Sequence, residues 1–444
     1  MSGTPAAGAV LPTPTPIPFR EAVRVWVRVA VQSFGGPAGQ IAVMHRILVE
    51  EKRWISEPRF LRALNFCMLL PGPEAQQLAV YMGWRLHGTT GGVVAGTLFV
   101  LPGVAAILLL SFLYVAARGL PAVDALFFGL KAAVLAIVVD ALLRIGRRAL
   151  GSPGRVILAA AAFVALFFFQ APFPAVVLGA GLLGWVLFRD PATTGEILET
   201  DTGEPPSGKR SLRLLLVCLL LWIAPLFLLA ALWGPRSIYL QLGAFFSRVA
   251  VVTFGGAYAV LPYVAQEAVS SQGWLSAGEM LDGLGMAETT PGPLIMVLQF
   301  VGFLAAYRNP TPLTPAAGGV LGSFVTTWVT FVPSFLFVLL GAPYVERLGR
   351  HRAAQGALSA ITAAVVGVIA NLSLWFFLHV IFGSVEERRI GALRLLQPDT
   401  STLSYPALLI AAAALVAMLR FQLRVGWVLL GGVAAGLVWR LVAA

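Results

Sequence analysis

The sequence predicts an all-α polytopic membrane protein made of two homologous halves of opposite orientation, joined by one extra transmembrane helix. Of its 444 residues, 58% are hydrophobic and only 11% are charged, whereas soluble proteins carry about 25% charged residues. Several apolar stretches exceed the roughly 18–20 residues that cross a bilayer as a helix. A pair of glycine and proline motifs also occurs twice at the same spacing. The apolar stretches are 92–117, 122–143, 155–188, 212–233, 316–345, 357–382 and 405–442.

The net charge of +11 does not indicate a nucleic-acid partner. The basic residues lie between apolar segments, as expected for cytoplasmic loops of a membrane protein, and they form no basic stripe. Membrane lipids are therefore the expected surroundings. Residues 1–18 lack the basic region and apolar core of a signal peptide and are expected to form a disordered tail rich in Pro and Thr. Cys67 and Cys218 stand alone in apolar segments, so we expect no disulfide, no metal site and no cofactor.

Residues 28–77 align with 248–297 without a gap. Phe34-Gly35-Gly36 falls on Phe254-Gly255-Gly256, and Pro71-Gly72-Pro73 falls on Pro291-Gly292-Pro293. The alignment resumes beyond an insertion at 308–315, and each half finishes with two short apolar stretches, 155–169 and 174–188, then 405–419 and 425–442. The chain therefore divides into a tail (1–18), an N-terminal repeat (19–188), a polar linker (189–211), a linking transmembrane helix without a counterpart (212–233) and a C-terminal repeat (238–442).

The distribution of basic residues predicts that the two repeats are inverted. The loop 38–62 holds five Lys or Arg residues, and the matching loop 258–282 holds none. The following loops reverse this bias, because Arg118 stands alone while its counterpart loop carries Arg347, Arg350 and Arg352. Short loops rich in Lys and Arg stay cytoplasmic, so equivalent loops lie on opposite sides. If the segments with the glycine and proline motifs are broken or re-entrant, more of the basic clusters lie on the cytoplasmic side than if these segments span the membrane.

The four motifs predict a substrate site near the middle of the membrane. Gly and Pro interrupt helices, and an interrupted backbone in a bilayer is tolerated only where protein or a water-filled cavity covers it. Inverted-repeat transporters place such breaks near the bilayer midplane, where helix N-termini face anionic substrates. We therefore expect the two FGG and two PGP motifs to converge on one anion site. The alternative is that these Gly and Pro residues only aid helix packing.

Arg28 and Arg248 stand at equivalent positions, six residues before each FGG motif. A charge within a membrane segment is a candidate for function, and a guanidinium offers a fork of donors that suits an oxyanion. The alternative is that both arginines extend to the membrane surface. Ser33 and Thr253, which directly precede the FGG motifs, are candidate hydroxyl donors or else helix-packing residues.

Further polar residues in apolar surroundings are candidates for proton coupling or for the substrate pathway: Glu74, Gln77, Lys131, Glu288 and Thr290. Glu74 and Glu288 are not equivalent in the repeat, because Glu74 aligns with Leu294 and Glu288 with Met68. Glu74 is also positioned to cap the helix that follows the first PGP motif. Lys131 is expected to pair with Asp124 or Asp140.

The sequence resembles the chromate ion transporter family, in its long-chain form. The stretches that carry the resemblance are SFGGPAGQIAVMH (33–45), LLPGPEAQQLAVYMGW (69–84), GGVVAGTLFVLPG (91–103), TFGGAYAVLPYVAQEAV (253–269) and GWLSAGEMLDGLGMAETTPGPLIMVLQFVGFLAAYRNP (273–310). The resemblance covers roughly residues 19–442. It implies a multi-pass protein of the inner (plasma) membrane with about 13 hydrophobic segments, two oppositely oriented halves, and export of chromate that confers resistance.

The family resemblance leaves a second substrate open. Sulfate is a tetrahedral dianion like chromate, and discrimination between them depends on small differences in cavity size and desolvation. The sequence does not separate uniport, proton coupling and sulfate exchange, and a homodimer is compatible with it. A membrane-embedded enzyme is a remote alternative, because the sequence has no H-E-x-x-H or G-x-S-x-G motif. A structural scaffold has no use for matched Gly and Pro breaks.

Overall fold

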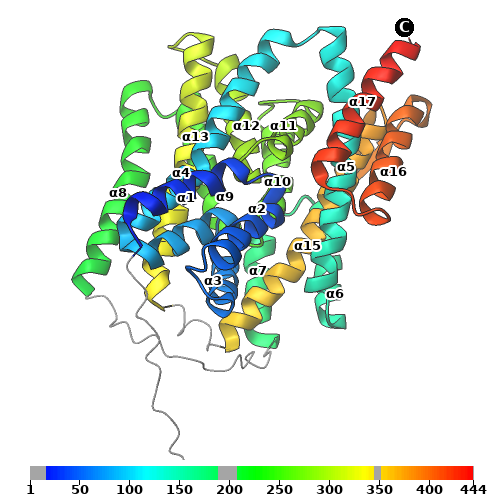
Figure 1. The fold of residues 1–444 in the computed structure, drawn as a ribbon. Helices are drawn as coiled ribbons and strands as arrows, with labels where there is room; N and C mark the ends of the chain where they lie inside the picture. Colours follow the sequence, from blue (N-terminus) through cyan, green and yellow to red (C-terminus); the bar gives the residue numbers. More distant parts are fainter. Residues whose placement is uncertain (1–16, 189–207, 345–351, 444) are drawn as a thin grey trace, which may run out of the picture.

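The structure, a computed structural model, describes residues 17–188, 208–344 and 352–443. Within these ranges it is a bundle of helices with a single two-stranded sheet (Figure 1). Most of the predicted tail (1–16) and most of the predicted linker (189–207) lie outside the described residues, as do Arg347 and Arg350. Helix α8 (Gly208–Trp233) begins within the predicted linker and continues through the predicted linking helix.

The first half consists of short helices followed by two long ones and then two short ones. Its elements are α1 (Phe19–Gln32), α2 (Gly36–His45), the π-helical turn η1 (Arg46–Glu51), α3 (Glu57–Leu69), α4 (Glu74–Ala117), α5 (Pro121–Ala149), α6 (Pro153–Phe167) and α7 (Phe173–Leu187).

The second half has elements in the corresponding order. They are α9 (Ile238–Val252), α10 (Ala257–Ala265), the π-helical turn η2 (Gln266–Ser271), α11 (Ala277–Thr289), η3 (Leu294–Met296), α12 (Val297–Arg308), α13 (Pro315–Gly341), η4 (Ala342–Tyr344), α15 (Arg352–Ile381), β1 (Val385–Ile390), β2 (Leu393–Pro398), η5 (Thr400–Thr402), α16 (Tyr405–Leu419) and α17 (Val425–Ala443). Strands β1 and β2 pair antiparallel, and this hairpin was not predicted from the sequence.

The register of the sequence alignment recurs in the element bounds. The π-helical turns begin at the aligned residues Arg46 and Gln266, and helices α3 and α11 begin at the aligned residues Glu57 and Ala277. Helices α2 and α3 have 10 and 13 residues, fewer than the roughly 20 that a single spanning helix needs. The short lengths agree with the broken segments expected from the Gly and Pro motifs.

Helix α4 is 44 residues long in its bounds but is bent back on itself at His87 and Gly88, which have non-helical backbone angles. A methyl group added to Gly83 would clash with the carbonyl oxygen of Gly91, so the two arms of α4 are in close contact. The second half makes the same reversal between α12 and α13 with the loop 309–314, which lies within the insertion identified in the sequence.

The two halves exchange their last helices. Helices α6 and α7 of the first half pack against α15 of the second, and α16 and α17 of the second half pack against α5 of the first (Figure 1). Glycines allow the close approach, because a methyl group on Gly184 of α7 would clash with the carbonyl oxygen of Gly356 of α15. The halves are therefore interlocked, and the largest hydrophobic cluster contains residues of both.

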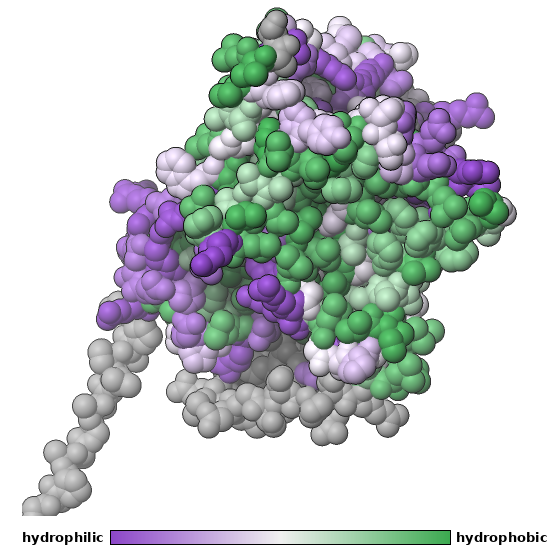
Figure 2. Space-filling model, turned by 90° about the vertical axis from the view of Figure 1, so that its right-hand side faces the viewer, coloured by the Kyte–Doolittle hydropathy of each residue, from purple (hydrophilic) through white to green (hydrophobic). Residues whose placement is uncertain are grey.

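The surface and the core both suit a membrane. In the described residues, six helices are long and apolar enough to cross a bilayer. Figure 2 shows a broad hydrophobic area over the middle of one face, with hydrophilic residues gathered mainly toward its edges. Helix α8 lies at one edge of the bundle in Figure 1, and only 11% of the residues in its 18-residue apolar stretch are buried. These features define an all-α polytopic membrane protein.

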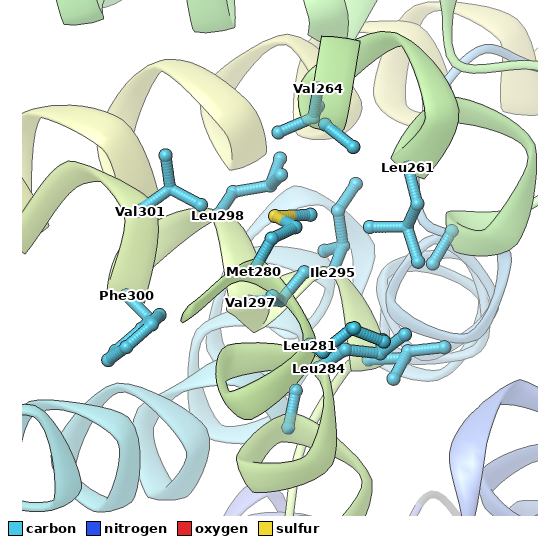
Figure 3. Packing of buried hydrophobic residues seen from close by; sticks show 14 of the residues in the cluster. Leu261, Val264, Met280, Leu281, Leu284, Ile295, Val297, Leu298, Phe300 and Val301 are labelled. Carbon is cyan, nitrogen blue, oxygen red and sulfur yellow. The ribbon is translucent and has the colours of Figure 1, made fainter. Parts of the chain in front are cut away.

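The second half holds the most densely buried segment. Side chains of α10, α11 and α12 lie close together in Figure 3, among them Leu261, Met280 and Leu298, which are buried. Ten of the 13 residues of α11 are buried, but only four of the 13 residues of α3, its counterpart. Two segments that are equivalent in sequence therefore have very different surroundings.

Candidate functional site

The four Gly and Pro motifs meet in crossed pairs. The backbone N–H of Gly72 donates to the carbonyl of Thr253 at 2.7 Å, and the N–H of Gly292 donates to the carbonyl of Ser33 at 2.9 Å. The two donors occupy aligned positions in the two halves, and so do the two acceptors. Each PGP motif of one half is thus bonded to the residue before the FGG motif of the other half.

Glycine is required at these breaks because their backbone angles are unfavourable for other residues. The four glycines of the FGG motifs have φ between +70° and +87°, and Gly72 and Gly292 have φ of +130° and +102°. Gly adopts such angles without the strain that a Cβ atom imposes. The second proline of each PGP motif is buried and the first is partly exposed, so the two motifs have similar surroundings.

The hydroxyl groups of Ser33 and Thr253 bond within their own helices. Ser33 Oγ donates to Val29 O at 2.7 Å, and Thr253 Oγ1 donates to Val249 O at 2.6 Å. Their carbonyls, rather than their hydroxyls, make the contact between the halves.

The aromatic residues of the two FGG motifs have different surroundings. Phe34 is 47% exposed, whereas Phe254 packs against the largest hydrophobic cluster. The difference follows the deeper burial of the second half.

Buried amide side chains surround the breaks. Gln77 Nε2 donates to Pro71 O at 2.7 Å, and Gln40 Nε2 donates to Gly292 O at 2.6 Å. Gln76 accepts a hydrogen bond from Ser334 Oγ at 2.5 Å. Gln40 Oε1, Gln77 Oε1 and Gln76 Nε2 are buried without a hydrogen-bond partner in the described part of the chain. Buried polar atoms in proteins almost always have partners, so these three atoms are candidates to contact a polar ligand.

Carboxylates lie beside the FGG motifs. Tyr258, two residues after the second FGG motif, donates a hydrogen bond to Oε1 of Glu288. Glu288 lies close to Gly36 of the first FGG motif, and Glu74 lies close to Gly256 of the second.

Thr290 is a buried residue at the end of α11. Its Oγ1 donates to Ala287 O at 3.2 Å, so the hydroxyl bonds within its own segment, like those of the two residues before the FGG motifs.

Arg28 and Arg248 make their described contacts away from the breaks. Arg28 pairs with Glu51 at 2.7 Å, and its side chain is 45% exposed. Arg248 lines a cavity of about 320 Å³, whose other lining residues include Glu267 and Trp274. The structure therefore brings the backbone motifs together, whereas the contacts of both arginines lie outside that meeting point.

Lys131 does not pair with Asp124 or Asp140, the partners expected from the sequence. Its Nζ lies 3.2 Å from Oδ1 of Asp282 on α11, and Asp140 pairs with Arg144 at 2.6 Å. Sequence proximity favoured partners on the same helix, whereas helix packing brings α11 of the second half against α5.

Gln40 and Tyr258 were not predicted as site residues from the sequence. Both lie within the stretches that follow the FGG motifs, Gln40 four residues after Gly36 and Tyr258 two residues after Gly256. A polar side chain within one helical turn of a break, in an otherwise apolar stretch, is the signal that indicates them. Gln76 has the same signal after the first PGP motif.

The fold and this meeting point define the class: a multi-pass membrane protein in which interrupted helices from both halves meet. A family model described as chromate transporter matches residues 20–185 and 240–437, one stretch in each half. The chain belongs to the chromate transporter family.

Three similar proteins are named as chromate transport proteins, one of them as a probable one. The chain is 32% identical to a chromate transport protein of Pseudomonas aeruginosa, over 81% of this chain and 82% of that protein. It is 29% identical to a chromate transport protein of Cupriavidus metallidurans, over 83% and 84%. It is 27% identical to a probable chromate transport protein of Synechococcus elongatus, over 80% and 83%. No solved structure matches the chain.

Proposed function

We propose that this protein is a secondary active transporter that exports chromate from the cytoplasm across the inner membrane by alternating access, and thereby confers chromate resistance. The observation that carries the proposal is the pair of reciprocal hydrogen bonds from Gly72 to Thr253 and from Gly292 to Ser33. They join interrupted backbone of both halves, and helix starts such as those at the FGG motifs present N–H groups that suit an anion. Membership of the chromate transporter family supports the substrate.

The membrane potential favours this direction. A cytoplasm-negative potential of 100 mV contributes about 2.3 kcal/mol for each charge, so about 4.6 kcal/mol for an uncompensated dianion. Backbone N–H groups contact an oxyanion without carrying a full charge, which leaves the substrate free to depart. The same donors accept sulfate, which makes sulfate the alternative substrate.

Different burial of equivalent segments supports alternating access. In an inverted-repeat transporter, the two halves take unequal conformations, and exchanging these conformations opens the site to the other side of the membrane. Leu61 on α3 is 46% exposed, whereas its repeat counterpart Leu281 on α11 is fully buried. We propose that the exposure of these two segments is exchanged during transport.

Chromate uptake into energised everted vesicles tests the substrate. Uptake of labelled chromate is measured with and without excess sulfate, for the wild-type (original) protein and for the variants Arg28→Ala, Arg248→Ala and Arg388→Ala. Arg388 lies on the exposed β-hairpin and is the matched control. We expect protein-dependent uptake that falls at least tenfold in Arg28→Ala and Arg248→Ala, because their positive charges attract the dianion along its pathway, and stays unchanged in Arg388→Ala.

Other outcomes assign the failure to a specific part of the proposal. If the protein transports sulfate but not chromate, the proposed substrate is wrong and the transporter class stands. Full uptake by both Arg28→Ala and Arg248→Ala would remove the arginines from the substrate pathway and leave the backbone motifs to bind the anion.

Labelling of single cysteines tests alternating access. Leu61→Cys and Leu281→Cys are compared for their rates of reaction with a maleimide reagent, with and without chromate. We expect Leu61→Cys to react faster in the resting protein, and transport to raise the rate of Leu281→Cys while lowering that of Leu61→Cys. Rates that chromate leaves unchanged at both positions would contradict movement of these helices.

A further inference from the structure

Each FGG motif starts a helix whose first residues face a carboxylate of the other half. Helix α2 begins at Gly36, where an added methyl group would lie 3.7 Å from Oε2 of Glu288. Helix α10 begins after Gly256, where an added methyl group would lie 3.2 Å from Oε1 of Glu74. The arrangement is reciprocal, because the first half supplies the carboxylate for the second and the second half supplies the carboxylate for the first.

The two carboxylates are not copies of one another. Glu74 aligns with Leu294, and Glu288 aligns with Met68. One carboxylate follows a PGP motif and the other precedes one, yet both reach the start of a helix created by an FGG motif. Such a helix start carries about half a positive charge and N–H groups without helical partners, so it attracts any anion within reach.

Glu288 is held in place by few interactions. Its residue is 4% exposed, and Tyr258 donates a hydrogen bond to Oε1. Its Oε2 has no hydrogen-bond partner in the part of the chain that the structure describes. Glu288 also lies in the last turn of α11, where the negative end of the helix dipole disfavours a carboxylate. Glu288 Oε2 therefore lies beside the start of α2 without a hydrogen bond of its own.

Glu74 is held in a similar way. It is the first residue of α4, and its carboxylate lies beside Gly256 at the start of α10. No hydrogen bond to the Glu74 side chain is found within the described ranges. A carboxylate beside a helix start occupies a position that also suits an oxyanion.

We infer that Glu288 and Glu74 are tethered anions that occupy the two helix starts of the proposed anion site, and that a tetrahedral dianion binds there by displacing them. The inference rests on the proposed function. Each position accepts either the carboxylate or the substrate, so the return of the carboxylate promotes release of the substrate. Orphan atoms of Gln40, Gln76 and Gln77 nearby are available to contact the substrate or its bound water.

Binding and transport measured separately test this inference. Purified protein in detergent is titrated with labelled chromate and labelled sulfate, and exchange is measured in proteoliposomes. The variants are Glu288→Gln and Glu74→Gln, and Glu386→Gln on the exposed hairpin is the control. Removal of the competing charge is expected to tighten anion binding about 5- to 30-fold, the upper part of the range for one helix terminus with an anion, and to slow exchange at least tenfold. Glu386→Gln should change neither quantity.

The outcomes separate this inference from the proposed function. If Glu288→Gln and Glu74→Gln elute as folded protein but bind chromate equally well or more weakly, the inference is wrong and the proposed function stands. If the original protein neither binds nor transports chromate or sulfate, the proposed function itself fails. Because the two carboxylates belong to different halves, Glu74→Gln still tests the inference if Glu288→Gln does not fold.

Discussion

Replacement of Gly292 by alanine is the sharpest test of how the two halves meet. Gly292 has φ of +102°, and an added methyl group would lie 3.0 Å from Cα and 3.1 Å from the backbone N of Gly103. Backbone atoms cannot rotate away as a flexible side chain does, so α4 and the second PGP motif must move apart. That movement lengthens the hydrogen bond from Gly292 to Ser33, which is 2.9 Å in the structure.

The magnitude follows from two contributions. An L-residue in an unfavourable backbone region costs about 1–3 kcal/mol, and loss of one buried backbone hydrogen bond costs about 1 kcal/mol. Gly292→Ala should therefore lower the free energy of unfolding by about 2–4 kcal/mol. Chromate uptake should fall by more than the loss of folded protein accounts for, because the substitution shifts the meeting point of both halves.

Two further Gly→Ala variants separate these contributions. Gly88 has φ of +63° with no atom within 4 Å of an added methyl group, so Gly88→Ala should cost about 1–2 kcal/mol from backbone strain alone. Gly179 lies inside α7 with open space around it, so Gly179→Ala should stabilise the protein by about 0.5–1 kcal/mol.

The assay is reversible unfolding in mixed micelles for all three variants, with chromate uptake measured in vesicles. The expected order of stability is Gly179→Ala, the original protein, Gly88→Ala and Gly292→Ala. If Gly292→Ala is as stable and as active as the original protein, the crossed contact between the PGP and FGG motifs does not have the geometry described above.

Two predictions concern ion pairs outside the breaks. Glu279→Gln should lower the free energy of unfolding by about 1–3 kcal/mol, because the buried Glu279 carboxylate accepts hydrogen bonds from Arg118 and from Arg308 (Nη2 to Oε1, 2.5 Å). This loss of stability is smaller than for a fully buried pair, since the arginine side chains are 51% and 37% exposed. An unchanged unfolding curve would show that solvent screens these pairs completely. In the β-hairpin, burial raises the pKa of Glu387, but hydrogen bonds and charges of its arginine partners, including Arg394, outweigh burial and hold that pKa below its usual range. The carboxylate therefore stabilises the fold above its unfolded pKa and loses this effect as the pH falls through the folded pKa. Glu387→Gln should lower the melting temperature slightly at neutral pH and not in acid below the folded pKa, and an equal loss at both pH values would exclude the ion pair as its cause.

The local features of the fold follow from the sequence. The apolar stretches 155–169 and 174–188 predict two helices, and α6 and α7 occur at 153–167 and 173–187. Their ends are predictable because apolar residues cover the length of a helix in lipid, and Gly and Pro interrupt it. The break positions are predictable for the same reason, and their repetition at aligned positions indicates that both halves need them.

The contacts of the site depended on packing between the halves. The exchange of α6 and α7 for α16 and α17, and the pairing of Lys131 with Asp282, join segments that are far apart in the sequence. A repeat alignment shows which residues are equivalent, but it does not show which residues touch. The β-hairpin was missed because it lies in a charged loop without alternating apolar residues on both strands.

By itself, the sequence determined the membrane environment, the duplication and the places where helices must break, because hydrophobicity and backbone freedom are properties of short segments. Only the tertiary structure decided that each PGP motif meets the opposite FGG motif, that Glu288 and Glu74 reach helix starts of the other half, and that Arg28 and Arg248 make their contacts outside the meeting point. Those outcomes depend on the packing of distant helices, since a buried carboxylate or carbonyl takes whichever donor the packed helices bring within reach.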